Sequence, residues 1–251
     1  MSLLSRMMPD FLGIGAQRAG TTWLWVHLRR HPQIWMPRRK ELHFFDRRRA
    51  LGSGPAAAAF ARVSYAAWFV PGRLRRHVVG EVTPAYATLA DERVALIASW
   101  MPRARIIYLI RDPVERAWSA AAKGFARWAG RELADAKEEE LLSFFRLPDV
   151  SVRGDYVFAV KTWRRHFPAD QILVCASEQM FADPLDHLRR VYRFLGVDPE
   201  IPLDAAPLRA RVHAGATPPI PPRVRRALGN GLYAQREELE SLLGFSLPWN
   251  R

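Results

Sequence analysis

The sequence contains a single cysteine, Cys175, among 251 residues. One cysteine excludes a disulfide within the chain and a zinc site built from several thiolates. Its neighbours at residues 171–176 (QILVCA) form an apolar run typical of a buried strand. We therefore interpret Cys175 as a small core side chain, with a nucleophilic thiol as the alternative.

Long apolar runs are absent as well. No stretch of about 18 uninterrupted apolar residues occurs, so we predict no integral membrane span. The first ten residues lack the apolar core of a secretory signal, and the first apolar stretch, Phe11–Gly15, leads directly into a glycine loop. We expect a cytoplasmic protein.

Lysine is scarce, since only four of the 38 basic residues are lysines, yet the formal net charge is +13. This charge favours an anionic partner, such as nucleic acid, acidic lipid headgroups or a phosphorylated or sulfated small molecule. The abundance of alanine and arginine is equally typical of a biased codon composition. Charge alone therefore does not select the partner.

No group of acidic, histidine or cysteine side chains has the spacing of a metal site, and we predict no metal cofactor. Six histidines are expected at the surface or at helix ends; these are His27, His31, His77, His166, His187 and His213.

Short apolar runs alternate with amphipathic segments, without repeats or a low-complexity linker. Alternating strands and helices are typical of parallel βαβ units, so we predict one α/β domain over residues 1–251 with an open parallel sheet of about five strands and helices on both faces. The predicted strands are Asp10–Gly15, Gln33–Met36, His77–Val82, Arg105–Ile110 and Gln171–Ala176. The predicted helices are Thr21–Arg30, Asp91–Trp100, Pro113–Trp128, Asp155–His166, Pro184–Leu195 and Ala234–Leu243.

A glycine loop, GAQRAGTT at residues 15–22, joins the first predicted strand to the first helix. Backbone N–H groups at such a junction, with the positive helix end, form a cradle for phosphate oxygens. Gly20 lets the backbone touch a ligand, while Thr21 and Thr22 can cap the helix and donate hydroxyl hydrogen bonds. A plain strand-to-helix turn is the alternative.

The loop is P-loop-like, but the lysine position of G-x-x-x-x-G-K-[ST] holds Thr21, and the nearest cation is Arg18. A phosphate-type ligand is therefore favoured, and hydrolysis of a nucleoside triphosphate is not.

A second phosphate-directed segment follows the predicted strand Arg105–Ile110. Arg111 leaves the carboxyl end of this strand, where ligands bind in open α/β sheets, and Ser119 lies two turns into the next helix. Arginine offers a bidentate fork to phosphate and serine a neutral donor. We interpret Asp112 as a helix cap or as a partner of Arg116. A strand–helix junction with a surface arginine explains this segment equally well, but two such segments predict a ligand with two separated anionic groups.

These segments resemble the sulfotransferase family that uses 3′-phosphoadenosine-5′-phosphosulfate (PAPS), particularly the branch of heparan-sulfate sulfotransferases and bacterial relatives. The resemblance covers most of the chain. It is carried by the glycine loop, KELHFFD at 40–46, GEVTPAY at 80–86, IRDPVERAWS at 110–119 and FADPL at 181–185.

The resemblance implies PAPS as co-substrate and adenosine 3′,5′-bisphosphate as product. Arg111 and Ser119 would hold the 3′-phosphate, and a basic loop near Arg211 would close on the cofactor. Trp25 lies close enough in sequence to reach the adenine. The 5′-phosphosulfate would bind the glycine-loop residues Gln17, Arg18, Ala19, Gly20, Thr21 and Thr22, with Trp23 beside the adenine.

Glu41 corresponds to the family's general base, with His43 beside it, and Arg18 would stabilise the leaving phosphate oxygen. In an extended segment, residues 41 and 43 point to the same side. The alternative for Glu41 is an exposed carboxylate paired with the basic residues 38–40.

Two positions depart from the family pattern. Arg18 replaces the loop lysine, and arginine cannot give its proton to the leaving oxygen. Val82 replaces a lysine that touches substrate and sulfate in the heparan-type enzymes, which argues against a heparan-like acceptor.

We predict sulfuryl transfer to a hydroxyl or amine of a carbohydrate, glycolipid or small metabolite. A small-metabolite kinase is one alternative. A basic nucleic-acid-binding protein is the other, although the clusters Arg47–Arg49 and Arg223–Arg226 lie in no nucleic-acid-binding motif, so we expect no nucleic-acid partner. Loops at Arg47–Pro71 and Ala129–Val150 are expected to form the acceptor walls; the oligomeric state is not predicted.

Overall fold

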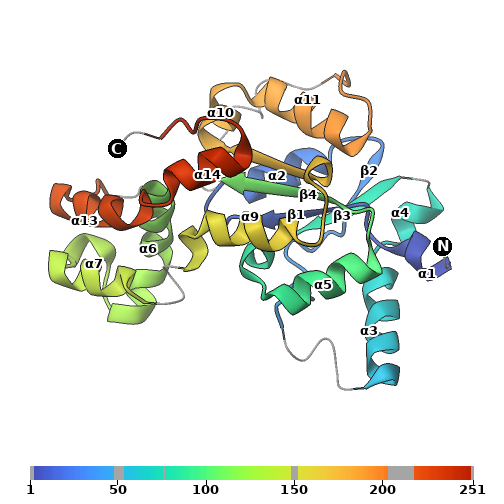
Figure 1. The fold of residues 1–251 in the computed structure, drawn as a ribbon, viewed down its shortest axis with the longest axis horizontal. Coiled ribbons are helices and arrows are strands. Elements are labelled where there is room, and N and C mark those ends of the chain that lie inside the picture. The colour runs from blue at the N-terminus through green and yellow to red at the C-terminus, as the bar shows by residue number, and fades with distance from the viewer. Residues whose placement is uncertain (1–2, 48–53, 76, 148–151, 203–217, 250–251) are drawn as a thin grey trace.

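The computed structural model describes residues 3–47, 54–75, 77–147, 152–202 and 218–249. Their five strands form one parallel sheet in the order β2-β3-β1-β4-β5 (Figure 1). All five predicted strands are confirmed to within one residue at each end. They are β1 (Phe11–Gly15), β2 (Ile34–Trp35), β3 (Val78–Val82), β4 (Arg105–Ile110) and β5 (Ile172–Ala176).

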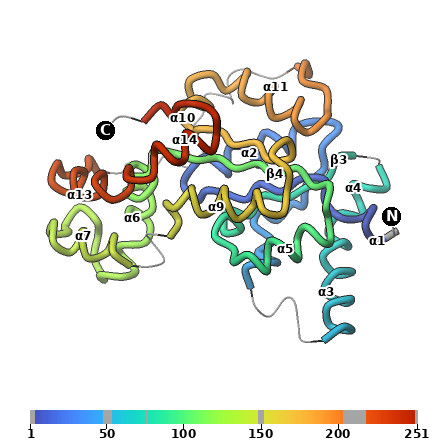
Figure 2. Tube along the Cα trace, in the orientation of Figure 1, coloured from blue at the N-terminus to red at the C-terminus, as the bar shows by residue number. Residues whose placement is uncertain are grey.

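Helices cover both faces of the sheet, as the tube in Figure 2 also shows. Helices α2 (Thr21–Leu28) and α11 (Pro184–Leu195) pack together on one face, and α5 (Asp91–Trp100) and α9 (Tyr156–Arg164) on the other. Every residue of β1 is buried, because a parallel strand between two helical layers has no solvent-facing side.

The strand order changes direction at the central strand β1. From β1 the chain first builds β2 and β3 on one side and then β4 and β5 on the other. The carboxyl ends of β1 and β4, which pair through Gly13 and Ile107, therefore lie at a topological switch point. Open α/β sheets bind ligands in the crevice at this position.

Local sequence signals set the ends of the helices. Helix α6 (Pro113–Ala129) has the side chain of Asp112 as its N-cap and ends at Gly130, whose φ of 71° lies in the left-handed region. Helix α11 has Asp183 as its cap and ends in the same way at Gly196.

The six predicted helices are confirmed with small changes at their ends; the last one is α14 (Arg236–Leu243). In the described residues, six further α-helices form in segments for which no helix was predicted or only a solvated helix face was considered. These are α1 (Leu3–Met7), α3 (Pro55–Ala67), α4 (Val70–Leu74), α7 (Glu138–Phe145), α10 (Ser177–Ala182) and α13 (Pro222–Leu232). Short 3-10 turns occur at η2 (Pro84–Thr88), η3 (Leu133–Asp135), η4 (Val152–Gly154) and η5 (Ala169–Gln171).

Helices α6, α7 and α13 enclose a second apolar cluster at one end of the molecule, on the left in Figure 1. The described parts of the expected acceptor-wall loops Arg47–Pro71 and Ala129–Val150 contain helices, with α3 in the first and α7 in the second.

Three of the histidines expected at the surface or at helix ends lie at or near helix ends and not at the surface. His27, His31 and His187 are buried, because their rings pack against aromatic side chains of α2 and α11. Burial lowers the pKa of His187 to about 4, with a further contribution from Arg190.

No helix among the described residues is long and apolar enough to cross a membrane.

Candidate active site

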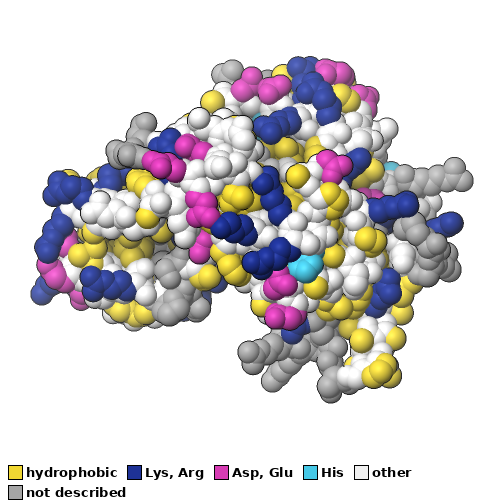
Figure 3. Space-filling model, viewed as in Figure 1, with side chains coloured by type: hydrophobic (Ala, Val, Ile, Leu, Met, Phe, Trp, Pro, Cys, Tyr) yellow, Lys and Arg dark blue, Asp and Glu magenta, His cyan; other side chains and the backbone are white. Residues whose placement is uncertain are grey.

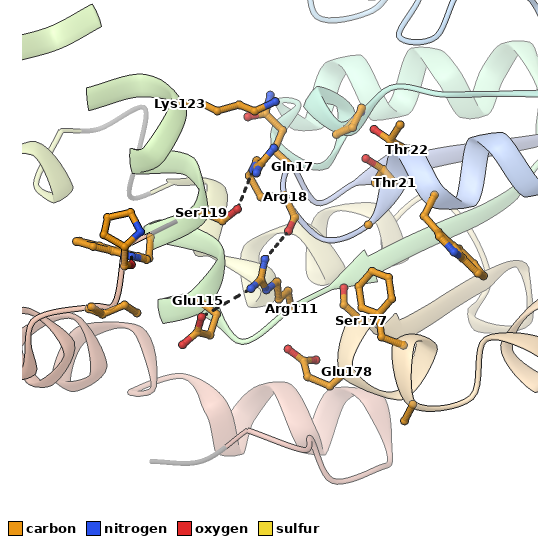
Figure 4. A pocket seen from close by; sticks show the side chains of 18 of the residues that line it. Gln17, Arg18, Thr21, Thr22, Arg111, Glu115, Ser119, Lys123, Ser177 and Glu178 are labelled. Atoms are coloured by element: carbon orange, nitrogen blue, oxygen red, sulfur yellow. Dashed lines mark hydrogen bonds and ion pairs between the residues drawn. The ribbon is translucent and has the colours of Figure 1, made fainter. Parts of the chain in front are cut away.

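A crevice of about 1030 Å³ opens at the switch point (Figure 4). The glycine loop, the carboxyl end of β4, helix α6 and helix α10 form its walls, and Pro218–Ile220 reach it from the C-terminal part of the chain. Trp118 on α6 donates its Nε1–H to the carbonyl of Pro218 at 2.6 Å, which holds this segment at the crevice. Five cationic and three carboxylate side chains line the crevice, so the space suits an anion.

The glycine loop presents an uncapped helix end to the crevice. Gly20 is the N-cap of α2, with φ 90°, and makes no side-chain cap hydrogen bond. The expected capping by Thr21 and Thr22 is therefore wrong, because both residues lie within the first turn. The N–H groups of this turn remain available to an anion.

Gly20 is favoured by its backbone conformation and by local packing. A Cβ atom at this position would overlap the Met180 side chain of α10, and its φ disfavours other residues. Ser177, at the start of α10, lies 2.6 Å from the carbonyl oxygen of Ala19 and 2.9 Å from that of Ile110. These contacts fasten the glycine loop to β4.

The two predicted anion sites meet at Arg18. Its Nε–H donates to Ser119 Oγ at 2.9 Å, and Arg111 donates to the carbonyl oxygen of Arg18 at 3.3 Å (Figure 4). Burial lowers the pKa of Arg18, and the nearby charge of Arg111 lowers it further. Two cations held this close repel each other, and a bound anion relieves that repulsion.

Arg111 and Ser119 are positioned by a strand end and a helix start. Asp112 Oδ1 accepts the N–H groups of Val114 and Glu115 at 2.9 and 3.1 Å, which confirms its role as a helix cap. Its other oxygen accepts the hydroxyl of Tyr233 at 2.6 Å.

Lys123 also lines the crevice. It follows Ser119 by four residues on α6, so both side chains lie on one helix face. This spacing was sufficient to identify Lys123 from the sequence.

Glu41 and His43 meet at the rim of the crevice. His43 Nε2 lies 3.3 Å from Glu41 Oε2, and His43 Nδ1 lies 2.7 Å from Asp46 Oδ2. Lys40 forms an ion pair with the other oxygen of Glu41. The expected basic neighbour and the expected histidine therefore both contact this carboxylate.

The backbone at Glu41 and His43 is not extended, so the prediction of an extended segment is wrong. Their φ angles are 61° and 55°, and that of Arg18 is 69°. These three are the positive-φ residues other than glycine in the described part of the chain. Such conformations cost about 1–3 kcal/mol each and concentrate at functional sites.

A buried carboxylate, Glu81, lies behind this rim. Tyr65 and Thr83 donate their hydroxyls to it at 2.6 and 2.7 Å, and Tyr86 does so at 3.1 Å. Burial raises the pKa of Glu81, although these hydrogen bonds act in the opposite direction.

The network of Glu81 reaches the backbone of residues 41–46. The N–H of Leu42 donates to Glu81, and the N–H of Phe44 donates to Tyr86 Oη at 3.0 Å. The segment that carries Glu41 and His43 is thus anchored to a buried carboxylate.

Most of the predicted site residues come together at this crevice. Its lining includes Gln17, Arg18, Gly20, Thr21, Thr22, Trp23, Glu41, Arg111 and Ser119. Ala19 is buried beneath the loop, and His43 reaches the site through Glu41. Arg211 lies outside the described residues.

Trp23, Trp25 and Val82 are held mainly by contacts within the protein. Trp23 is 1 % exposed and packs mainly on His27, and Trp25 is stacked by Arg29 at 4.5 Å. Val82 is buried against Gly13, so its side chain does not reach the crevice.

Sequence reasoning assigned no site role to several lining residues. Lys40 lies inside the motif at 40–46 and Glu115 inside the motif at 110–119, whereas Glu178 lies in neither. Glu178 enters through the tertiary structure, by accepting the N–H of Asp112 at 2.8 Å.

The fold and the crevice define a P-loop-like α/β protein with a cation-lined crevice beside a carboxylate–imidazole pair. The family model described as "Sulfotransferase domain" matches residues 8–206, and the chain belongs to this sulfotransferase family.

Characterised relatives agree with this family. The chain is 31 % identical to heparan sulfate glucosamine 3-O-sulfotransferase 3B1 of Mus musculus over 204 residues, which cover 77 % of this chain and 47 % of the relative. It is 26 % identical to bifunctional heparan sulfate N-deacetylase/N-sulfotransferase 3 of Homo sapiens over 216 residues, which cover 76 % of this chain and 23 % of the relative. The chain thus spans about half the length of the first relative and less than a quarter of the second.

Among solved structures, a sulfotransferase from Alicyclobacillus acidocaldarius superposes with a TM-score of 0.72 at 27 % identity, over 95 % of this chain and 97 % of that one.

Proposed function

We propose that this protein transfers a sulfuryl group from PAPS to a hydroxyl or amine acceptor. The observation that carries the proposal is the meeting of Arg18, Arg111 and Ser119 at an uncapped helix end, with Glu41 on the same crevice. Family membership supports sulfuryl transfer.

The crevice fits a nucleotide with two anionic ends. In this proposal Arg111 and Ser119 bind the 3′-phosphate, with Lys123 as an additional cation from the same helix face. The N–H groups at the start of α2 bind the 5′-phosphosulfate. The guanidinium of Arg18 contacts Ser119 in this structure, so it must turn from the 3′ end toward the 5′ end to act on the leaving group.

The reaction requires one proton transfer and one displacement. The acceptor oxygen or nitrogen attacks sulfur, a new bond to sulfur forms, and the bond from sulfur to the 5′-phosphate oxygen breaks. Glu41 takes the acceptor proton, and His43, held between Glu41 and Asp46, fixes the carboxylate. Negative charge that develops on the leaving oxygen is stabilised by the loop N–H groups and by Arg18.

The acceptor that we propose is not limited to heparan sulfate, which is part of the names of the relatives. These names favour a glycan here. Val82 is buried, however, where the heparan-type enzymes present a lysine. We therefore propose a carbohydrate, glycolipid or small metabolite.

Transfer of labelled sulfate from PAPS to a panel of glycans, glycolipids and phenols tests the proposal. Glu41→Gln is expected to slow turnover by about a hundredfold to ten-thousandfold, because the proton acceptor is lost. Arg111→Ala is expected to weaken binding of adenosine 3′,5′-bisphosphate by about tenfold to a hundredfold. Glu92→Gln and Arg103→Ala, which change exposed charges away from the crevice lining, serve as matched controls.

Calorimetry separates this function from that of a small-metabolite kinase. The proposal requires tighter binding of adenosine 3′,5′-bisphosphate than of ATP with magnesium. The reverse preference, or full activity in both site variants, would overturn it.

A further inference from the structure

Helices α3 and α4 expose an apolar surface. Four of the nine exposed large hydrophobic side chains in the described residues lie here. Leu74 is 77 % exposed, Phe60 75 %, Val63 54 % and Trp68 42 %. Figure 3 shows apolar side chains over the outer end of α3, which projects from the body of the molecule.

Helix α3 is apolar on both of its sides. Tyr65 and Ala61 point inward and are buried, whereas Phe60 and Val63, three residues apart, share the outer face. Arg62 is the single charged residue of this helix. A helix that is apolar all round is normally covered on all sides, so the outer face is suited to a partner.

A groove of about 500 Å³ adjoins this surface. Trp68 and Pro71 line one side of it and Trp35 another, while Arg38 and Arg39 lie at its edge. The exposed apolar residues are therefore next to exposed cations.

The charge of this region is mostly positive, although Arg73 of α4 is paired with Asp10 at 2.8 Å. Residues 47–80 contain seven arginines and no aspartate or glutamate. Arg38, Arg39 and Arg75 are exposed, and none of them forms an ion pair with a carboxylate of the described residues. By contrast, Arg223 and Arg225, on the far side of the molecule, are both paired with glutamates.

We propose that the face formed by α3, α4 and Arg38–Arg39 docks on the surface of an anionic lipid bilayer. Phe60, Trp68 and Leu74 enter the region between headgroups and acyl chains, and the arginines bind the lipid phosphates. This combination of apolar insertion and positive charge is typical of helices that lie in a membrane interface.

Two other partners fit the surface less well. A nucleic acid would use the arginines but would leave Phe60 and Leu74 exposed. A second copy of the chain, related by a two-fold axis, would bring the same unpaired arginines against each other.

The docking face is continuous with the crevice along the chain. Arg39 lines the groove, and Glu41, two residues later, lines the crevice. Docking therefore brings the segment that carries Glu41 toward the lipid surface, and it is independent of whether sulfuryl transfer takes place.

Flotation of the full chain with vesicles tests the proposal. Vesicles of phosphatidylglycerol and phosphatidylcholine in equal amounts are expected to bind the protein, and vesicles of phosphatidylcholine alone to bind it much more weakly. The double variant Phe60→Ser/Leu74→Ser is expected to lower the partition coefficient by about tenfold or more. Arg39→Gln is expected to lower it by about fivefold.

Matched variants keep the result specific. Phe158→Ser on α9 and Arg226→Gln on α13 also change exposed residues, and both are expected to bind vesicles like the unchanged protein. Circular dichroism checks that every variant is folded. Failure to bind anionic vesicles, equal loss in the control variants, or a dimer in light scattering that Phe60→Ser/Leu74→Ser dissociates would each overturn the proposal.

Discussion

At the scale of single residues, Arg18, Glu41 and His43 combine unfavourable backbone conformation with a shared position in space. They come from two segments of the chain, and a left-handed φ at each is maintained by surrounding contacts. Arg111 holds the carbonyl of Arg18, and the Glu81 network holds the segment of Glu41 and His43. The strain is localised where side chains must point at one ligand.

Glu81 is therefore expected to position Glu41 without touching the substrate. Glu81→Gln should lower kcat by about tenfold to a hundredfold, because the amide group cannot accept all of the present hydrogen bonds and the segment at residues 41–46 shifts. Affinity for adenosine 3′,5′-bisphosphate should stay within about twofold. Steady-state kinetics and calorimetry measure the two quantities.

A buried hydroxyl elsewhere provides the control for Glu81. Thr162→Val on α9 changes a residue that is 1 % exposed, and we expect lower stability with unchanged kcat. If Glu81→Gln and Thr162→Val lower kcat by the same factor, the role of Glu81 is structural only.

At the scale of secondary-structure elements, local signals were most reliable where polar caps and prolines surround an apolar run. The start of α6 followed from Asp112 and Pro113, and that of α11 from Asp183 and Pro184. Helices such as α3 were missed because a segment rich in alanine shows no amphipathic period. Its helical state depends on packing of Tyr65 against Phe44, Phe45 and Phe69.

The cap of α6 also has a role in the site that the cap of α11 does not. Asp112→Ala is expected to cost about 1–2 kcal/mol of unfolding free energy and to weaken nucleotide binding several-fold, because Arg111 and Ser119 flank the helix start. Asp183→Ala removes the equivalent cap, which accepts the N–H of Asp186 at 3.0 Å, away from Arg111.

Comparison of the two variants distinguishes helix stability from ligand binding. Chemical denaturation should give the larger loss for Asp112→Ala, because its carboxylate also accepts the hydroxyl of Tyr233, and calorimetry should show weaker binding for Asp112→Ala alone. Equal affinities would show that the helix start does not position the anion site.

At the scale of the whole molecule, charge is distributed unevenly over two apolar clusters. The sheet and its flanking helices form the large core, and α6, α7 and α13 enclose the smaller one. Cations paired with carboxylates decorate the small cluster, whereas unpaired arginines surround the apolar face of α3 and α4. The net charge of +13 therefore includes the cations of the crevice and those of the proposed membrane-facing surface.

Burial of His187 makes the stability of the whole protein depend on pH. Its folded pKa of about 4 lies below the usual value, so the unfolded chain binds a proton between about pH 6.5 and 4 and the native state does not. Stability is present above this window and is lost as the pH falls through it. Denaturation at a series of pH values should show a loss of about 3 kcal/mol that His187→Gln removes.

A buried residue of the same helix that does not titrate is the control for this prediction. Leu188→Ala on α11 should lower the stability and leave its pH dependence unchanged. If His187→Gln shows the same slope as the unchanged protein, His187 is not the group responsible.

The sequence by itself determined the parallel sheet, the glycine loop and nine of the residues that line the crevice. These follow from local features: continuous apolar runs, a glycine at a strand–helix junction and an arginine at a strand end. Only the tertiary structure decided that Arg18 contacts Ser119, 101 residues away, and that Glu81 anchors the segment of Glu41. Such contacts depend on how distant segments pack, and no local period or cap encodes them.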